Sequence, residues 1–272
     1  MKNFAKLITA LLLVLSPISC SNSENMVHPD TVPVIQSQSA NNDSDLSIKQ
    51  AENILQQYPE AKKIFLEWKP EEIQGLQFKQ GIAKKLLSNR NSNFSKNELE
   101  KILNEKPAFI KQSFKPISFS ADQGEHKAKI SEWWYYNGHL NTPEGKKYGY
   151  EVCFFRSSPI IYFAHIAITD ENNKKFTYER KFYSPLKIKT QKATADIAYD
   201  NQKIIQTGEF SYKIDCEVGP FKLNFNLDME KGPLLINGNG LIDMPEGTDS
   251  YYYSLTKLKT TGTLTENGNV IP

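Results

Sequence analysis

The pattern of hydrophobic and polar positions divides the chain into a helical part and a β part. Between residues 47 and 112, apolar residues such as Ala51 and Leu55 recur at three- and four-residue intervals, the spacing of an amphipathic helix. Ser47 and Ser95 each stand three residues before a Gln or a Glu, which is the pattern of a capping box at a helix start. We therefore predict a small all-α segment over residues 47–112.

From residue 119 onward the pattern predicts strands. Short runs of aromatic and β-branched residues alternate with turn sequences that contain Gly, Pro, Asn or Asp. Because no helical pattern separates these runs, they predict an antiparallel barrel or sandwich. A last pair, residues 250–258 and 261–266, is predicted to form a hairpin. The earlier predicted strands are residues 148–155, 160–169, 175–183 and 221–227.

Residues 131–140, SEWWYYNGHL, hold four consecutive aromatic residues. Such density favours a strand, because flat rings pack well on a pleated surface. Side chains alternate along a strand, so Glu132 shares a face with Trp134, and Trp133 shares the other face with Tyr135. We expect both faces to be buried, one against a barrel lumen and one against a covering element. The Glu132 carboxyl group would then lie where ionisation is costly.

This motif, together with FFR at 154–156, AH at 164–165 and SYYYS at 250–254, resembles the AttH/CrtC-like superfamily. That group contains carotenoid 1,2-hydratases, related hydratases, fungal pericyclases and many uncharacterised secreted proteins. The resemblance extends from about residue 119 to the C-terminus. It implies two consecutive lipocalin-like β-barrels, and it implies nothing about the helical segment.

The expected fold is therefore mainly β, with a lipocalin-like antiparallel barrel over residues 113–247 that follows the all-α segment. Residues 248–272 are expected to be the start of a second, truncated lipocalin-like domain. In relatives of this kind a motif with Asp and His follows that start and supplies catalytic groups, and this sequence does not contain it.

Residues 1–20 have the pattern of an export signal, with Lys2 and Lys6 before an apolar run. That run is too short to span a bilayer, which takes about 20 residues. Cys20 follows small residues as in a bacterial lipobox, although Pro17 stands where Leu is usual. We expect lipidation at Cys20, with secretion by simple cleavage as the alternative.

Residues 21–46 are rich in Ser, Asn, Asp and Gln and predict a flexible tether. The expected location is the cell envelope, through a lipid anchor in the membrane on its periplasmic or outer face, or outside the cell. Of the remaining cysteines, Cys153 and Cys216 either form a disulfide in an oxidising compartment or stay as two free thiols.

The composition and the absence of certain motifs argue against several classes of function. A net charge of +2, from 33 basic and 31 acidic residues, argues against a nucleic-acid surface. The sequence has no Gly-rich phosphate loop, no nucleophile elbow and no Cys/His spacing typical of zinc. We therefore predict no cofactor and no metal site.

Adding water to an isolated alkene requires a proton donor, a cavity that tolerates a cation, and a positioned water molecule. Glu132 is the candidate acid, because burial among aromatic rings keeps a carboxyl group protonated. His139 or His165 is the candidate that orients water or acts as a base. The candidate ligand-binding residues, whose rings would stabilise a cation or line the cavity, are Trp133, Trp134, Tyr135, Arg156 and Tyr252.

Each of these residues also has a structural interpretation. The two Trp residues can plug the closed end of a barrel with an Arg stacked on them. Glu132 can form a buried ion pair with Arg156 that fixes strand register. His165 can be a core histidine whose hydrogen bonds are satisfied.

Two functions remain open on the sequence. The first is an exported lipocalin-like protein that binds a hydrophobic small molecule, an isoprenoid or a lipid, and in an enzymatic form acts as a hydratase-type lyase or a pericyclase-like catalyst. The alternative is a non-catalytic accessory lipoprotein whose helical segment contacts a protein partner. An open cavity with an unpaired Glu132 would favour the first, whereas a filled cavity with Glu132 bound to Arg156 would favour the second.

Overall fold

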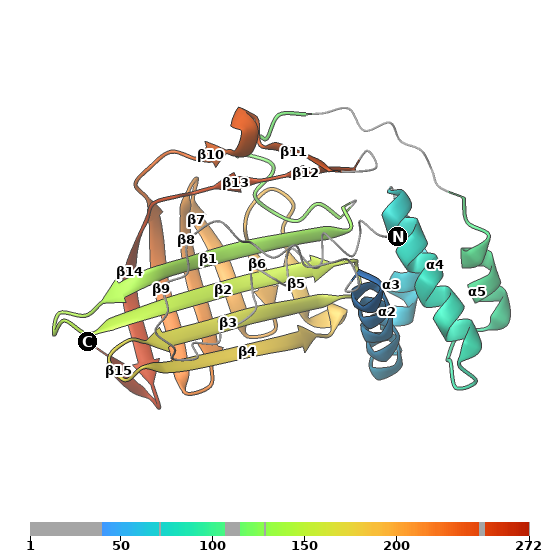
Figure 1. The fold of residues 1–272 in the computed structure, drawn as a ribbon, viewed down its shortest axis with the longest axis horizontal. Coiled ribbons are helices and arrows are strands. Elements are labelled where there is room, and N and C mark those ends of the chain that lie inside the picture. Colours follow the sequence, from blue (N-terminus) through green and yellow to red (C-terminus); the bar gives the residue numbers. More distant parts are fainter. Residues whose placement is uncertain (1–39, 71, 107–114, 128, 245–247, 272) are drawn as a thin grey trace, which may run out of the picture.

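The computed structural model describes residues 40–70, 72–106, 115–127, 129–244 and 248–271, and it confirms a mainly β chain with helices on its N-terminal side (Figure 1). The predicted export signal, Cys20 and most of the predicted tether lie outside these residues. The helices are α2 (Ala40–Gln57), α3 (Ala61–Glu67), α4 (Ile73–Ser88) and α5 (Lys96–Leu103).

Two of the predicted boundaries at the start of the helical segment are wrong. Helix α2 begins at Ala40, so the predicted tether over residues 21–46 ends too late, and Ser47 lies inside the helix rather than at its start. A Ser-x-x-Gln pattern cannot show whether helical turns precede it. The second capping box is confirmed, since the Ser95 hydroxyl accepts the Glu98 amide at 3.3 Å and the Glu98 carboxylate accepts the Ser95 amide at 2.7 Å.

The helices pack on one end of the β domain (Figure 1). Their apolar faces meet in a core that includes Phe65, Ile82 and Leu99, all at most 1% exposed. Ile160 and Ile161, which come from the turn between two strands, are buried in the same core. The helical segment therefore closes that end of the β domain.

The strands form two antiparallel sheets of four and seven strands with two small pairs beside them (Figure 1). The four-stranded sheet has the order β1 (Ser131–Asn141), β2 (Lys147–Ser157), β3 (Tyr162–Asp170), β4 (Lys175–Tyr183). The seven-stranded sheet has the order β15 (Asn269–Ile271), β14 (Leu258–Glu266), β9 (Phe221–Met229), β8 (Ser211–Val218), β7 (Gln202–Gly208), β6 (Ile197–Tyr199), β5 (Ile188–Thr190).

Aromatic side chains fill the space between the two sheets. Phe154 packs edge-on against Tyr199 at a ring distance of 4.8 Å, and Tyr150 packs against Phe225 at 5.1 Å. All four are at most 4% exposed. Aromatic rings therefore pack much of the expected lumen.

The predicted hairpin of residues 250–258 and 261–266 is not formed. Strand β14 instead pairs along its whole length with β9 of the seven-stranded sheet. Gly262 makes this possible, because a Cβ at this position would lie 2.1 Å from the Asn224 carbonyl oxygen and its φ is +141°. Sequence spacing favours local pairing, whereas this pairing joins segments far apart in the chain.

The strands β10 to β13 form a long arm that precedes β14 and runs along β1 (Figure 1). In it, β10 (Leu234–Leu235) pairs with β13 (Tyr253–Ser254), and β11 (Leu241–Met244) pairs with β12 (Thr248–Tyr251). Tyr253 packs edge-on against Phe119 at 5.0 Å, and Tyr252 lies 6.2 Å from Trp133. These ring contacts hold the arm near β1.

Cys153 and Cys216 are both buried and free, so the predicted alternative of two thiols is the one found. Among the described helices, none is long and apolar enough to cross a bilayer.

The capping box of α5 gives a first test. We expect Ser95→Ala to lower the free energy of unfolding by about 1 kcal/mol, because the Glu98 amide loses its acceptor. Denaturant titration measures this change. Ser95→Asp, which restores a capping oxygen, should recover most of the loss. Equal destabilisation by both variants would contradict a capping role.

Candidate functional site

A cleft of about 1160 Å³ lies between strand β1 and the arm. Strand β1 is an edge strand of its sheet, so one side of its backbone is free to face this cleft. Trp133 and Trp134 line it from β1, and Tyr252 lines it from the arm. Aromatic rings therefore form part of the wall on both sides, as suits a guest with an apolar portion.

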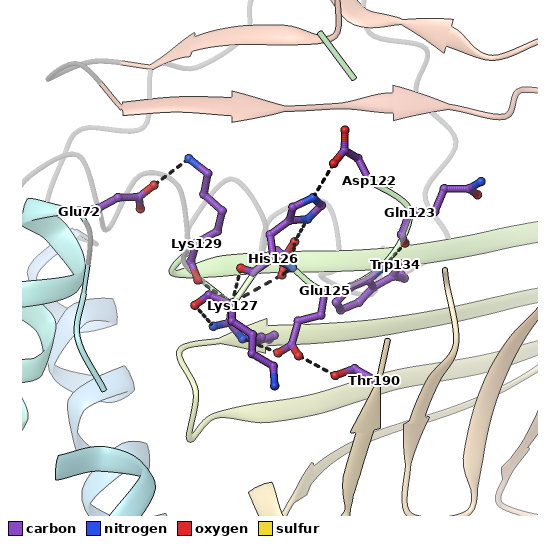
Figure 2. A network of polar contacts seen from close by, with 11 residues as sticks. Glu72, Asp122, Gln123, Glu125, His126, Lys127, Lys129, Trp134 and Thr190 are labelled. Carbon is purple, nitrogen blue, oxygen red and sulfur yellow. Dashed lines mark hydrogen bonds and ion pairs between the residues drawn. The ribbon is translucent and has the colours of Figure 1, made fainter. Parts of the chain in front are cut away.

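His126 lies at the polar end of the cleft between two carboxylates (Figure 2). Its Nδ1 is 2.6 Å from Glu132 Oε1, and its Nε2 is 3.3 Å from Asp122 Oδ1. Its backbone amide also donates to both oxygens of Glu132, at 3.0 and 2.8 Å. With an acceptor at each ring nitrogen, the geometry suits a doubly protonated imidazolium.

The loop that carries His126 lies just before β1 and is held in place by Arg156. Its guanidinium donates to the carbonyl oxygens of Lys129 at 2.5 Å and Lys127 at 2.9 Å. Its Nη1 lies 3.6 Å from Glu132 Oε2, and its Nε lies 2.9 Å from Glu125 Oε1. Arg156 is 1% exposed, so these contacts satisfy a charge that would be costly to bury alone.

Glu125 is the buried counter-charge of Arg156. It is 3% exposed, and its carboxylate accepts hydrogen bonds from the hydroxyls of Tyr162 at 3.2 Å and Thr190 at 2.6 Å. These contacts join the four-stranded sheet, the loop and the seven-stranded sheet. The loop that carries His126 is thus fixed to both sheets.

The model of a family described as AttH-like matches residues 111–272 of this chain. The chain belongs to the AttH-like family. A solved AttH protein of Nitrosomonas europaea is similar at 28% identity and a TM-score of 0.52, with 58% of this chain and 52% of that chain covered. Kievitone hydratase of Nectria haematococca is similar at 14% identity and a TM-score of 0.46, with 57% and 47% covered.

This AttH-like chain spans about half the length of both solved structures. The likeness to the AttH protein supports the lipocalin-like fold that the sequence predicts. The likeness to the hydratase is too distant to carry an argument. No curated protein matches the chain.

The cleft brings together most of the site residues predicted from the sequence. Its lining includes Glu132, His139, Trp133, Trp134, Tyr135 and Tyr252, but neither Arg156 nor His165. Arg156 acts from inside the fold on the loop that bears His126. His139 lines the far end with a side chain that is 87% exposed, and its Nδ1 is 3.6 Å from Glu171.

The two faces of β1 have the predicted composition, but the expectation that both are buried is wrong. Tyr136, on the face of Glu132 and Trp134, is buried in the core between the sheets. Tyr135, on the opposite face, is 40% exposed. An edge strand has no neighbour on one side, so its outer side chains stay open to solvent unless another element covers them.

His165 lies on the outer face of the four-stranded sheet, away from the cleft. It is 1% exposed, its ring packs against Phe155 and Phe163, and neither ring nitrogen has a hydrogen-bond partner among the described residues. The core position expected of His165 is therefore found without the expected hydrogen bonds. Burial, with a contribution from Arg180, lowers its pKa to about 4.

No sequence pattern pointed to His126, Asp122 or Glu125. They occupy a polar stretch before β1, where nothing in the local spacing shows that the chain folds back onto Glu132 and Arg156. The hydrogen bond with Glu132 is the main cause that raises the pKa of His126. Among the described residues no group of His, Cys, Asp and Glu is arranged to hold a metal ion.

His165 predicts a loss of stability in acid. Its pKa is about 4 when folded and about 6.5 when unfolded, so the unfolded chain binds the proton first as the pH falls. We expect this residue to lower the free energy of unfolding by about 3 kcal/mol between pH 7 and pH 4. His165→Phe should remove that part of the pH dependence in denaturant titrations. His139→Phe is the control, and an unchanged slope in His165→Phe would refute the assignment.

His126 predicts a pH dependence of stability with the opposite sign. Because its pKa is raised on folding, its contribution to stability is present below the unfolded value of about 6.5 and is lost as the pH rises through the folded value. His126→Gln should therefore destabilise the protein more at pH 6 than at pH 9. NMR titration of the imidazole should show a pKa above 6.5, and a lower value would contradict the geometry.

Proposed function

We propose that this protein binds a hydrophobic small molecule, an isoprenoid or a lipid, in the cleft along β1, and that it adds water to that molecule in a hydratase-type reaction. The observation that carries the proposal is the cleft of about 1160 Å³, partly lined by aromatic rings, with an imidazole at its polar end whose pKa is raised by its hydrogen bond with Glu132. Membership of the AttH-like family supports it.

The cleft suits a neutral apolar guest better than an acid. Its polar end holds two carboxylates, Asp122 and Glu132, around His126, and Lys129 at the same end is paired with Glu72 at 3.1 Å. A carboxylate headgroup would approach these acidic groups at a Coulombic cost. The rings of Trp133 and Trp134 stabilise an apolar chain and a developing cation without such a cost.

His126 replaces Glu132 as the proposed proton donor. Glu132 accepts the amide and ring contacts of His126, so its role is to orient the imidazole and stabilise its charge. The imidazolium would deliver a proton to the alkene, and the neutral ring would then accept a proton from the attacking water. The pair thus returns to its starting state after one water is added.

We also propose that the protein is exported and anchored in the cell envelope through lipidated Cys20, or is secreted. This rests on the pattern of residues 1–20, with a charged start, a short apolar run and small residues before the cysteine. A lipid anchor would hold the cleft close to the membrane, where apolar ligands concentrate.

A second candidate is the non-catalytic accessory lipoprotein. It is favoured by the packed core between the sheets and by the contact of Glu132 with Arg156, which are the features expected of a scaffold. In that case the helices α2–α5 would offer the surface for a protein partner.

One experiment separates the two candidates. Apolar molecules are extracted from natively purified protein and identified by mass spectrometry, and the extraction is repeated after incubation with an isoprenoid mixture. We expect a stoichiometric ligand and a mass gain of one water. Trp134→Ala should lower ligand retention roughly tenfold, since a buried aromatic contact is worth more than 1 kcal/mol. Ile205→Ala, at an exposed apolar residue of β7, is the matched control.

The proton donor is tested in the same assay. His126→Gln should abolish the mass gain while ligand retention stays, and Glu132→Gln should reduce the rate by about 10²-fold or more. Retention without any mass gain in the wild-type protein would establish a binder rather than an enzyme. An empty extract with no change on incubation would reject the proposal and favour the scaffold.

A further inference from the structure

The outer face of the four-stranded sheet exposes three aromatic rings, two of which lie outside the cleft lining. Tyr178 and Phe176 on β4 are 40% and 53% exposed, and their rings stack 6.2 Å apart at 13°. Tyr135 on β1 is 40% exposed on the same face. Single exposed rings are ordinary, but three on one face of one sheet form a patch.

Glu151 lies in the middle of this patch. In the strand register it stands level with Ala167 on β3 and Tyr178 on β4. Its partner on β1 is Asn137, which lies two residues from Tyr135. Ala167 is small and 5% exposed, so neighbouring side chains on this face cover it. The carboxylate accepts a hydrogen bond from the Tyr135 hydroxyl at 3.4 Å.

No cation pairs with Glu151 among the described residues. The nearest candidate on this face, Arg180, instead places its guanidinium 5.6 Å over the ring of Phe182. Partial burial raises the pKa of Glu151, which is the effect of a carboxylate that has lost water without gaining a positive partner. The patch thus combines electron-rich rings with a negative charge that has no ion-pair partner among the described residues.

His165 lies at the edge of the patch and supports the same interpretation. Its ring contacts Tyr178 at 5.7 Å in an edge-on geometry, and its two nitrogens have no partner among the described residues. Because its pKa is about 4, the ring is neutral near pH 7 and does not repel a cation.

From this arrangement we propose that the outer face binds the quaternary ammonium group of a small organic cation, with Glu151 as the counter-charge and the rings of Tyr135 and Tyr178 as its walls. Quaternary ammonium is favoured over a primary amine because it is weakly hydrated and needs ring faces and one negative charge rather than three acceptors. Tyr135 also lines the cleft, but Glu151 and Tyr178 do not, so substitutions at these two residues test the outer site apart from the cleft.

Choline is the probe, and 3,3-dimethyl-1-butanol, its neutral isostere, is the control ligand. Isothermal titration should show saturable choline binding in the millimolar range, as expected of a partly exposed site, and at least about fivefold weaker binding of the isostere. Glu151→Gln and Tyr178→Leu should each weaken choline binding by about fivefold or more. Glu179→Gln makes the same charge change on the opposite face of the sheet and should leave binding unchanged.

Circular dichroism checks that each variant keeps its fold. The proposal is overturned by an absence of saturable choline binding, by equal affinity for choline and its isostere, or by a Glu151→Gln variant that binds as the wild type does. Equal losses in Glu151→Gln and Glu179→Gln would show a general charge effect and would reject the site as well.

Discussion

The buried guanidinium of Arg156 is the interaction on which the rest of the site depends. It reaches the carboxylates of Glu125 and Glu132 and three carbonyl oxygens of the loop that holds His126. A charge this deeply buried is tolerated only when nearly every donor is satisfied, and removing one partner of such a pair typically costs about 3–5 kcal/mol. These contacts place His126 at one end of the cleft.

The packed core between the sheets confines the cleft to one side of the fold. Aromatic rings fill much of that space, and the cleft opens where β1 faces the arm, with the core residues Tyr136 and Tyr212 also in its lining. Because β1 is an edge strand, no neighbouring strand covers its free side, and its side chains can line the cleft. The arm covers that wall through a few ring contacts, so the apolar site is formed by segments that are far apart in sequence.

His126 and His165 show how environment decides the role of one side-chain type. His126 has an acceptor at each ring nitrogen, which favours its protonated form. His165 has apolar rings around it and a nearby guanidinium, which favour its neutral form. The first is suited to proton transfer at the cleft, and the second keeps the outer face free of added positive charge.

Local pattern was sufficient for much of the fold. Alternating aromatic and β-branched residues predicted antiparallel strands, the motif at 131–140 predicted the β1 strand and the composition of its two faces, and the Ser95 capping box predicted the start of α5. These features depend on neighbours in the sequence, where side-chain period and hydrogen bonding act over a few residues. Ser47, which lies inside α2, shows the limit of such signals.

Tertiary structure alone decided the site. The pairing of β14 with β9, the filling of the core and the return of the loop at residue 126 onto Glu132 and Arg156 each join segments separated along the chain. No periodicity encodes such contacts, because they arise from the packing of whole sheets and the need to satisfy a buried charge. The sequence by itself therefore determined the strands and their aromatic faces, and only the folded chain decided that His126 would stand beside Glu132.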